Sequence, residues 1–145
     1  MTKKIAVIGR GFAFMDLKVG FRFRTHRRTI READLAAFVA LTGLTEELFS
    51  VQEERQLVPG ALVYSFAEGL LLPSMQDTGL AFLNATLDIK APTLVGDTLH
   101  VECEVTEARK TSKGDRGLVR FRNRVVNDKG ETVLEYNPLR LLKLK

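Results

Sequence analysis

The side chains of this 145-residue chain that could do chemistry are few. The chain has one cysteine, Cys103, and two histidines, His26 and His100. A disulfide needs two cysteines, and a structural zinc site needs four protein ligands drawn mainly from Cys and His, so one chain can build neither. Any reaction must use carboxylates, hydroxyls, backbone amides or the two histidines, and we expect no metal and no cofactor.

The neighbours of these three residues favour structural roles for them. His100 alternates with apolar residues on the polar side of a predicted strand, so we expect it to face solvent. His26 lies among three arginines, whose charge disfavours a protonated imidazole, and no carboxylate is nearby in the sequence. Cys103 falls on the apolar side of its strand and is predicted to be a small buried residue rather than a nucleophile.

Glu68 stands out among the carboxylates because it interrupts an otherwise apolar helix predicted over residues 60–72. Tyr64 and Ser65 lie close to it on the same helix. A buried, unpaired carboxylate is costly and usually finds a partner. We favour a pairing with an arginine or a place at a subunit interface, and catalysis by Glu68 is the alternative.

The net charge of +4 is unevenly spread along the chain. Residues 1–31 carry nine Lys or Arg and a single acid, whereas residues 44–58 carry four glutamates and one arginine. A basic segment can attract nucleic acid, an anionic membrane or a phosphorylated ligand. The chain has no helix-turn-helix signal and no basic motif interleaved with aromatic residues, so nucleic acid is not an expected partner.

Export and membrane insertion are not expected either. The apolar run at residues 5–8 is too short for the core of a signal peptide. The longest apolar stretch, residues 57–73, falls short of a membrane span and contains Glu68 and two glycines. We therefore expect a cytoplasmic protein with no membrane partner.

The elements that must position these residues begin with two helices. Thr29 and Glu32 have the spacing of a capping box, which predicts that a helix starts there and ends at Gly43. A second helix is predicted over residues 60–72, with a proline on each side. Apolar residues cover almost its whole circumference, so it should be buried on most sides.

After the second helix the sequence changes to strands. Four segments are rich in Val, Leu, Thr and Phe and are separated by short turn signals: residues 80–91, 98–107, 118–127 and 132–144. Gaps this short require antiparallel pairing. The pattern predicts a single α+β domain over residues 1–145, in which a long antiparallel sheet wraps around the helix at residues 60–72.

Several segments of the chain carry a resemblance to one family. They are residues 14–20, 29–34, 40–43, 58–62 and 90–99, and the last contains the most specific piece, Lys-Ala-Pro-x-x-x-Gly-Asp-Thr-Leu. Their order resembles the MaoC-like dehydratases, the relatives of (R)-specific enoyl-CoA hydratases, over nearly the whole chain. The resemblance implies a hot-dog fold, dimerisation with the sheets joined edge to edge, and a site for an acyl thioester of CoA or of a carrier protein.

The family adds water across a 2-enoyl thioester with an aspartate and a histidine. The aspartate follows the glycine that ends the first helix, and the histidine comes five residues later. Here these positions hold Leu44 and Phe49, neither of which transfers a proton, so both are expected to line the substrate site and hydration is expected to be impaired. A gapped alignment would bring a nearby glutamate to the vacant position, with Glu47 as the catalytic candidate. A solvated helix face is the simpler interpretation of these glutamates.

The resemblance also places the thioester carbonyl near the N-terminus of the second helix. Gly60 and Ala61 occupy that place, and free amides there can polarise a carbonyl oxygen. Gly60 is thus a catalytic candidate through its amide, and Ala61 a candidate contact with the substrate. Lys90 and Pro92 are expected near the thioester entrance.

An arginine stripe is a further candidate for substrate binding. Arg120, Arg122 and Arg124 alternate along one predicted strand. They could bind the phosphates of CoA or of phosphopantetheine. We favour the alternative that they form the solvent-facing side of the sheet.

Three functions are open at this point. The first is a MaoC-like enoyl-CoA hydratase or acyl dehydratase, nominally a lyase, whose hydration is impaired or carried by substituted groups. The second is a hot-dog acyl-CoA thioesterase that uses Glu68. The third is a non-catalytic module that binds acyl thioesters, which Leu44 and Phe49 favour. In each case the expected partners are an acyl-CoA or acyl-carrier thioester and further copies of the chain, as a homodimer or a higher homo-oligomer.

Overall fold

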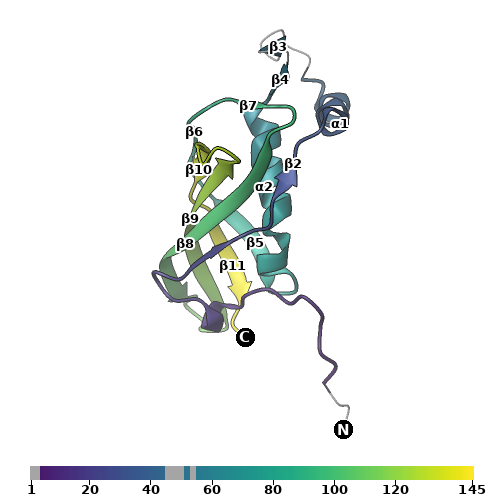
Figure 1. The fold of residues 1–145 in the computed structure, drawn as a ribbon. Coiled ribbons are helices and arrows are strands. Elements are labelled where there is room, and N and C mark those ends of the chain that lie inside the picture. The colour runs from purple at the N-terminus through teal and green to yellow at the C-terminus, as the bar shows by residue number, and fades with distance from the viewer. Residues whose placement is uncertain (1–3, 45–50, 53–54) are drawn as a thin grey trace.

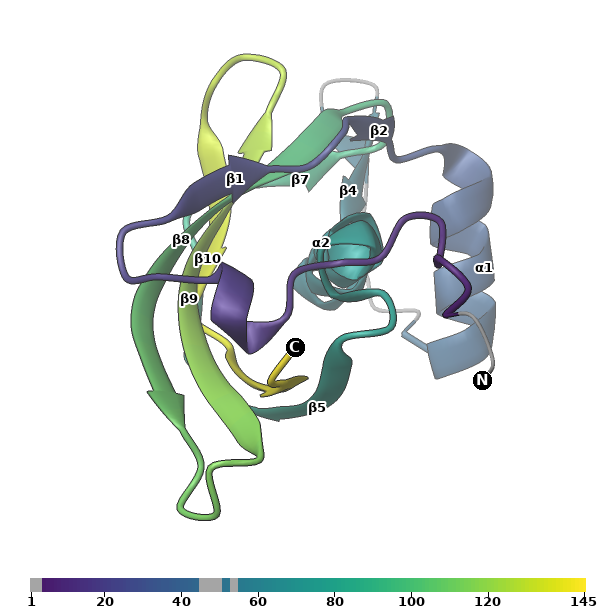
Figure 2. The same ribbon diagram turned by 90° about the horizontal axis from the view of Figure 1, so that it is seen from below.

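The fold is a curved antiparallel sheet around one long helix. The computed structural model describes residues 4–44, 51–52 and 55–145. Helix α2 (Gly60–Met75) lies in the hollow of the sheet, and helix α1 (Glu32–Thr42) stands outside it, as Figures 1 and 2 show. The predicted α+β architecture, with a long sheet wrapped around a central helix, is confirmed.

The sheet has eight strands and a long central hairpin. Its strands are β1 (Arg22–Arg24), β2 (Arg28–Thr29), β5 (Gly79–Asn84), β6 (Leu87–Ile89), β8 (Thr98–Lys110), β9 (Arg116–Asn127), β10 (Thr132–Tyr136) and β11 (Leu139–Lys143). Strands β8 and β9 form the hairpin, with β1 and β2 beside β8. Strands β10 and β11 both pair with β9, and β6 and β5 form the outer edge next to them.

A smaller sheet and a short turn of helix complete the described elements. The small sheet joins β3 (Val51–Gln52), β4 (Arg55–Val58) and β7 (Thr93–Leu94). Its strand β4 is followed by Pro59 and then by the first residue of α2. The 3-10 turn η1 (Phe14–Asp16) precedes β1.

Two predicted strands are each divided in the structure. The segment predicted at residues 80–91 forms β5 and β6, and the segment predicted at 132–144 forms β10 and β11. Pro138 has no N–H to donate to a ladder, which accounts for the second break. The two breaks are tied together, because the backbone amide and hydroxyl of Thr86 both donate to the Oδ1 of Asn137, at 2.8 and 2.6 Å.

Helix α2 is longer than predicted, since it continues through Pro73 to Met75. The N-terminal segment pairs with its last turn: the amide of Gly11 donates to the carbonyl of Gln76 at 2.8 Å, and that of Phe12 to the carbonyl of Ser74 at 2.7 Å. These bonds satisfy carbonyls that a helix end leaves free. A contact distant in sequence therefore supports the extra turn.

Helix α1 ends where predicted but starts differently. Gly43 has φ 77° and its amide bonds back to Val39, so the left-handed stop is confirmed. Thr29 does not cap the helix, because it lies in β2 and its hydroxyl hydrogen-bonds to that of Thr98 at 2.7 Å. The helix starts after Arg31, whose amide donates to the carboxylate of Asp34 at 2.8 Å.

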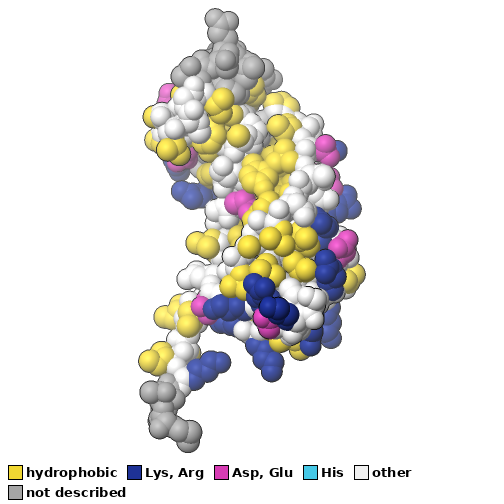
Figure 3. Space-filling model, turned by 180° about the vertical axis from the view of Figure 1, so that it is seen from behind, with side chains coloured by type: hydrophobic (Ala, Val, Ile, Leu, Met, Phe, Trp, Pro, Cys, Tyr) yellow, Lys and Arg dark blue, Asp and Glu magenta, His cyan; other side chains and the backbone are white. Residues whose placement is uncertain are grey.

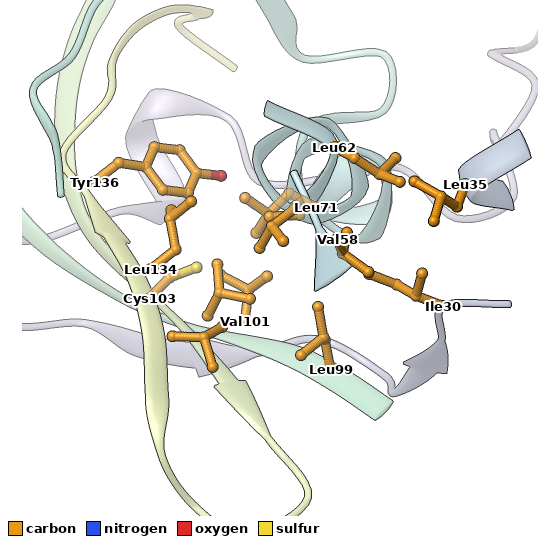
Figure 4. Packing of buried hydrophobic residues seen from close by; sticks show 14 residues of the cluster. Ile30, Leu35, Val58, Leu62, Leu71, Leu99, Val101, Cys103, Leu134 and Tyr136 are labelled. Carbon is orange, nitrogen blue, oxygen red and sulfur yellow. The ribbon is translucent and has the colours of Figure 1, made fainter. Parts of the chain in front are cut away.

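The main core fills the space between α2 and the concave side of the sheet (Figure 4). Leu62 and Leu71 of α2 and Leu99, Val101 and Cys103 of β8 are all buried there. Burying one such Leu or Val side chain contributes about 2 kcal/mol. This packing holds α2 in place and thereby fixes where its N-terminus points.

Candidate functional site

A cavity of about 400 Å³ opens at the N-terminus of α2. Its wall is formed by β4, the first turn of α2, β6 with the segment after it, and β10. The apolar side chains on this wall include those of Leu57, Val58, Val63, Ile89, Val133 and Leu134. Among the described residues that line it, the polar side chains are those of Lys90 and Thr93. The described wall thus holds no carboxylate and no imidazole.

The start of α2, which borders this cavity at Gly60 and Val63, has free backbone amides. The carbonyl of Pro59 accepts the amides of Leu62 and Val63, at 3.0 and 3.1 Å. The amides of Gly60 and Ala61 have no acceptor within the helix, and Pro59 supplies no side-chain cap. The helix dipole adds partial positive charge at this end, so the site suits an oxygen that carries partial negative charge.

The segment at residues 90–99 frames the cavity opposite the helix. Asp97 is its fixed point: one carboxylate oxygen accepts the amide of Leu94 at 2.9 Å, and the other accepts Nη1 of Arg55 at 2.9 Å. Gly96 has φ 97°, a left-handed conformation that favours glycine. Thr93 pairs with Val58, so the Gly-Asp turn positions the strand that borders the first turn of α2.

The structure brings three of the predicted site residues together at this cavity. Gly60, Lys90 and Pro92 all line it. Lys90 is exposed and forms no ion pair with any described residue. Ala61 is exposed and is not one of the lining residues.

Glu68 lies away from this cavity, in a network with two residues of the sheet. Arg140 of β11 donates to both carboxylate oxygens, at 2.9 and 2.6 Å, and the hydroxyl of Tyr136 donates at 2.7 Å. The side chain of Arg140 is 7% exposed and that of Glu68 is 24% exposed. Burial and the nearby Glu68 charge raise the pKa of Tyr136. The favoured pairing of Glu68 with an arginine is confirmed.

A relative of known activity shows the family of the chain. The chain is 33% identical over 102 residues to an (R)-specific enoyl-CoA hydratase from Aeromonas caviae, an overlap of 66% of this chain and 75% of that protein. The chain belongs to the family of MaoC-like dehydratases and (R)-specific enoyl-CoA hydratases. No family model matches the sequence.

Solved structures agree with this family and show its fold. A MaoC-like dehydratase from Rhodospirillum rubrum superposes with a TM-score of 0.79 at 25% identity, over 93% of this chain and 99% of that one. A Mycobacterium tuberculosis protein with a double hot-dog fold superposes with a TM-score of 0.82 at 23% identity, over 97% of this chain and 46% of that one. The predicted hot-dog fold is confirmed.

In this MaoC-like chain, Leu44 is the residue that the resemblance aligns with the family aspartate. Leu44 follows Gly43 and is half-buried, and its amide lies 3.3 Å from the hydroxyl of Thr42. It is not one of the residues that line the cavity. Phe49 and Glu47 lie outside the described residues, so their predicted roles stay predictions.

The prediction for His100 was wrong. The residue is 7% exposed, and its Nε2 lies 2.9 Å from a carboxylate oxygen of Glu102. The segment that links β1 to β2 lies beside β8, where Thr25 hydrogen-bonds to Val101, and Arg27 and Arg124 border the same depression as His100. An alternation pattern identifies the outer face of a strand but cannot show which side chains of neighbouring strands surround a residue there.

The predictions for the other two residues agree with the structure. Cys103 is 3% exposed, and burial raises the pKa of its thiol to about 12. A thiol with this pKa stays protonated at neutral pH and is a poor nucleophile. His26 is exposed, as expected.

The arginine stripe on β9 is engaged with neighbouring strands. Arg122 donates to Glu135 at 2.8 Å, and Arg124 to Glu102 at 3.3 Å. Arg120 donates to the carbonyl of Asn137 at 2.9 Å. The interpretation as the outer side of the sheet is the one that these contacts favour.

Sequence reasoning missed the apolar part of the cavity wall. Ile89 lies opposite Leu134 because β6 pairs with β10, and Val133 is the neighbour of Leu134. Ile89 is 44 or more positions from these two residues along the chain. The available signal was local: Ile89 directly precedes the predicted Lys90.

The described residues were also compared with the requirements of a membrane span and of a metal site. In this part of the chain, no helix is long and apolar enough to cross a membrane. Within the same part of the chain, no three His, Cys, Asp or Glu side chains gather where they could hold a metal ion.

Proposed function

We propose that this chain binds an acyl thioester of CoA or of a carrier protein in the cavity at the N-terminus of α2. The observation that carries the proposal is the shape of that site, where free helix amides meet an apolar wall. The named activity of the Aeromonas relative, an enoyl-CoA hydratase, supports a CoA thioester as the ligand class.

The apolar wall suits an acyl chain. A volume of about 400 Å³ is within the usual range for a small-molecule site. Each CH₂ group that leaves water for such a wall contributes about 0.8 kcal/mol. Lys90 on the rim supplies a positive charge that can attract the phosphates of CoA or of a phosphopantetheine arm.

The helix amides suit the thioester carbonyl. An oxygen that accepts the N–H groups of Gly60 and Ala61 would be held in the field of the helix dipole. Such donors stabilise the negative charge that develops on the oxygen when an enolate forms. Without a group that transfers protons, polarisation of the carbonyl favours binding rather than turnover.

We further propose that hydration by the family's usual pair is impaired in this chain. Leu44 and Phe49 stand at the positions of the aspartate and histidine, and neither can act as acid or base. The described wall of the cavity offers only Lys90 and Thr93 as polar side chains. Glu47 stays the candidate that would restore a proton-transfer group.

Two measurements on the purified chain test this proposal. Saturated acyl-CoAs of increasing length should raise the melting temperature, with larger shifts for longer chains up to the length of the cavity. Crotonyl-CoA should bind in the same way but keep its enoyl absorbance at high protein concentration. An absence of thermal stabilisation by every thioester would refute the binding site, and rapid loss of enoyl absorbance would refute the impairment.

Restoring the missing pair is a stricter test of the impairment. The double variant Leu44→Asp with Phe49→His should gain measurable hydration of crotonyl-CoA, whereas each single variant should stay at the background rate because the reaction needs both groups. A double variant that still binds the thioester but does not hydrate it would show that the chain lacks more of the catalytic site than this pair.

Thioesterase activity through Glu68 is the alternative function. The three hydrogen bonds to the Glu68 carboxylate leave it engaged with Arg140 and Tyr136, outside the residues that line the cavity. This geometry favours a structural role. Release of free thiol from saturated acyl-CoAs that is abolished by Glu68→Gln, in a variant that still folds, would reverse that preference.

We also propose that the chain forms a homodimer through the edge made by β5 and β6. Each of these strands has one described partner, β11 and β10 respectively, so its other side offers unpaired backbone groups. Exposed apolar side chains follow this edge and the adjoining helix: Leu72, Leu80, Phe82, Leu83, Leu87 and Ile89. Figure 3 shows apolar side chains gathered on the back of the molecule. A second copy would pair the edge and cover these side chains.

A further inference from the structure

Ile89 is the last residue of strand β6 and lines the cavity. The residue is 61% exposed, yet its side chain reaches the first turn of α2. A Cβ atom added to Gly60 would overlap Cδ1 of Ile89 and would lie 3.2 Å from its Cγ1. The end of the Ile89 side chain therefore fills the space directly beside Gly60.

The position of Ile89 is fixed by the sheet. Its backbone lies opposite Leu134 in the antiparallel pairing of β6 with β10. Branching at Cβ leaves an isoleucine in a strand few χ1 rotamers. The pairing and the χ1 restriction thus direct the Ile89 side chain towards Gly60, and its apolar end meets whatever occupies the space there, although the residue is 61% exposed.

We propose that Ile89 determines the specificity of the site by excluding acyl groups that carry a branch at carbon 2. The inference rests on the proposed function, which places the thioester carbonyl at the amides of Gly60 and Ala61. Carbon 2 is bonded to that carbonyl carbon and lies beside Gly60. A methyl branch there competes with Cδ1 of Ile89 for the same space, whereas a straight chain continues along the cavity wall towards Val63 and Val133.

The two ligands that the site should distinguish differ by one methyl group. In a hydrophobic pocket, a difference of this size changes the preference for one ligand over the other by about 10- to 200-fold. The unmodified chain should bind butyryl-CoA at least about tenfold more tightly than 2-methylbutyryl-CoA, which is at the low end of that range. Ile89→Ala removes the wall and should bring the two dissociation constants close together. Ile89→Val keeps the branch at Cβ but lacks Cδ1. Its ratio of the two dissociation constants should lie between the ratios of the unmodified chain and of Ile89→Ala.

The experiment measures both dissociation constants by calorimetry for the unmodified chain, Ile89→Ala, Ile89→Val and a matched control. Leu87→Ala is the control, because Leu87 is exposed on the same edge strand but does not line the cavity. It should keep the unmodified ratio. Melting temperature and oligomeric state are compared first, so that a change in fold or assembly is not read as a change in specificity.

The possible results separate the two proposals. A ratio that is unchanged in Ile89→Ala, or that collapses equally in Leu87→Ala, overturns the assignment to Ile89 while leaving the thioester site in place. Equal binding of the straight and branched thioesters by the unmodified chain also overturns it. If the unmodified chain binds neither thioester, the proposed function itself is refuted, and the assignment to Ile89 fails with it.

Discussion

Glu102 is the acceptor of a small charged group on the outer side of the sheet. Its carboxylate lies 2.9 Å from Nε2 of His100 and accepts Nη2 of Arg124 at 3.3 Å. The hydrogen bond with His100 is the largest of the causes that lower the pKa of Glu102 below its ordinary value of 4.5. The charged form is therefore stabilised more in the folded chain than in the unfolded chain.

The lowered pKa of Glu102 predicts a loss of stability in acid. The group binds its proton less readily in the folded state, so its contribution is present above pH 4.5 and disappears as the pH falls through the folded pKa. Urea unfolding of the unmodified chain and of Glu102→Gln should give free energies that differ at pH 7 and converge towards pH 3. Glu107→Gln, at the exposed end of the same strand, should show a smaller difference at pH 7. A difference for Glu102→Gln that grows in acid would contradict this assignment.

The buried thiol of Cys103 predicts slow chemical modification. Its pKa of about 12 leaves almost no thiolate at pH 8, and the residue is 3% exposed. A thiol reagent such as N-ethylmaleimide should therefore label the folded chain far more slowly than the chain in urea, where the thiol regains an ordinary pKa. Mass spectrometry of timed samples measures both rates. Equal rates would show that the strand β8 opens readily or that the thiol is accessible.

Among the elements, α2 is tied to the sheet by polar as well as apolar contacts. The carboxylate of Glu68 reaches across to Arg140 of β11 and Tyr136 of β10. The guanidinium of Arg140 also lies 5.3 Å from the centre of the Phe82 ring on β5. The Glu68–Arg140 pair thus joins the helix to three strands, β5, β10 and β11.

Removing Arg140 should destabilise the fold more than removing an exposed arginine. Arg140→Met leaves the half-buried Glu68 carboxylate without its cation, and breaking such a buried pair costs about 3 kcal/mol. Arg122→Met breaks a surface pair with Glu135 of similar length, 2.8 Å, and should cost much less, because water screens an exposed ion pair. Urea unfolding at pH 7 measures both losses. Similar losses in the two variants would show that Glu68 finds water or another partner.

Local patterns predicted the elements, whereas contacts distant in sequence decided their limits. Gly43 ended α1 as expected, because a left-handed stop depends on one residue. Thr29 could not cap that helix, because it lies in β2, where its hydroxyl bonds to that of Thr98, 69 positions further along the chain. The positions of the family pair, Leu44 and Phe49, stay a prediction from the resemblance, whereas the apolar wall around Ile89 depends on which strand pairs with β6. That pairing joins segments that no local pattern relates.

At the scale of the whole molecule, the edge formed by β5 and β6 is the surface through which we propose that the chain dimerises. All six residues of β5 and all three of β6 are exposed. Stable interfaces bury about 800 Å² on each partner, and their centres are rich in apolar and aromatic side chains. An isologous dimer would bring each edge against its own copy and would place Ile89 of each cavity near the boundary between subunits.

A charge on this edge should therefore separate the subunits. Leu83→Lys places an ammonium group on β5, where the twofold relation would set it near its own copy in an apolar interface, and burial of an unpaired charge is strongly unfavourable. Sedimentation should give twice the monomer mass for the unmodified chain and the monomer mass for this variant at the same concentration. Val19→Lys adds the same charge at an exposed position before β1 and should leave the dimer intact. A monomer in the unmodified chain, or a dimer that survives Leu83→Lys, would mean that this edge is not the interface. Because the cavity lies next to the same edge, thioester binding measured on the monomeric variant would also show whether one subunit suffices to hold the ligand.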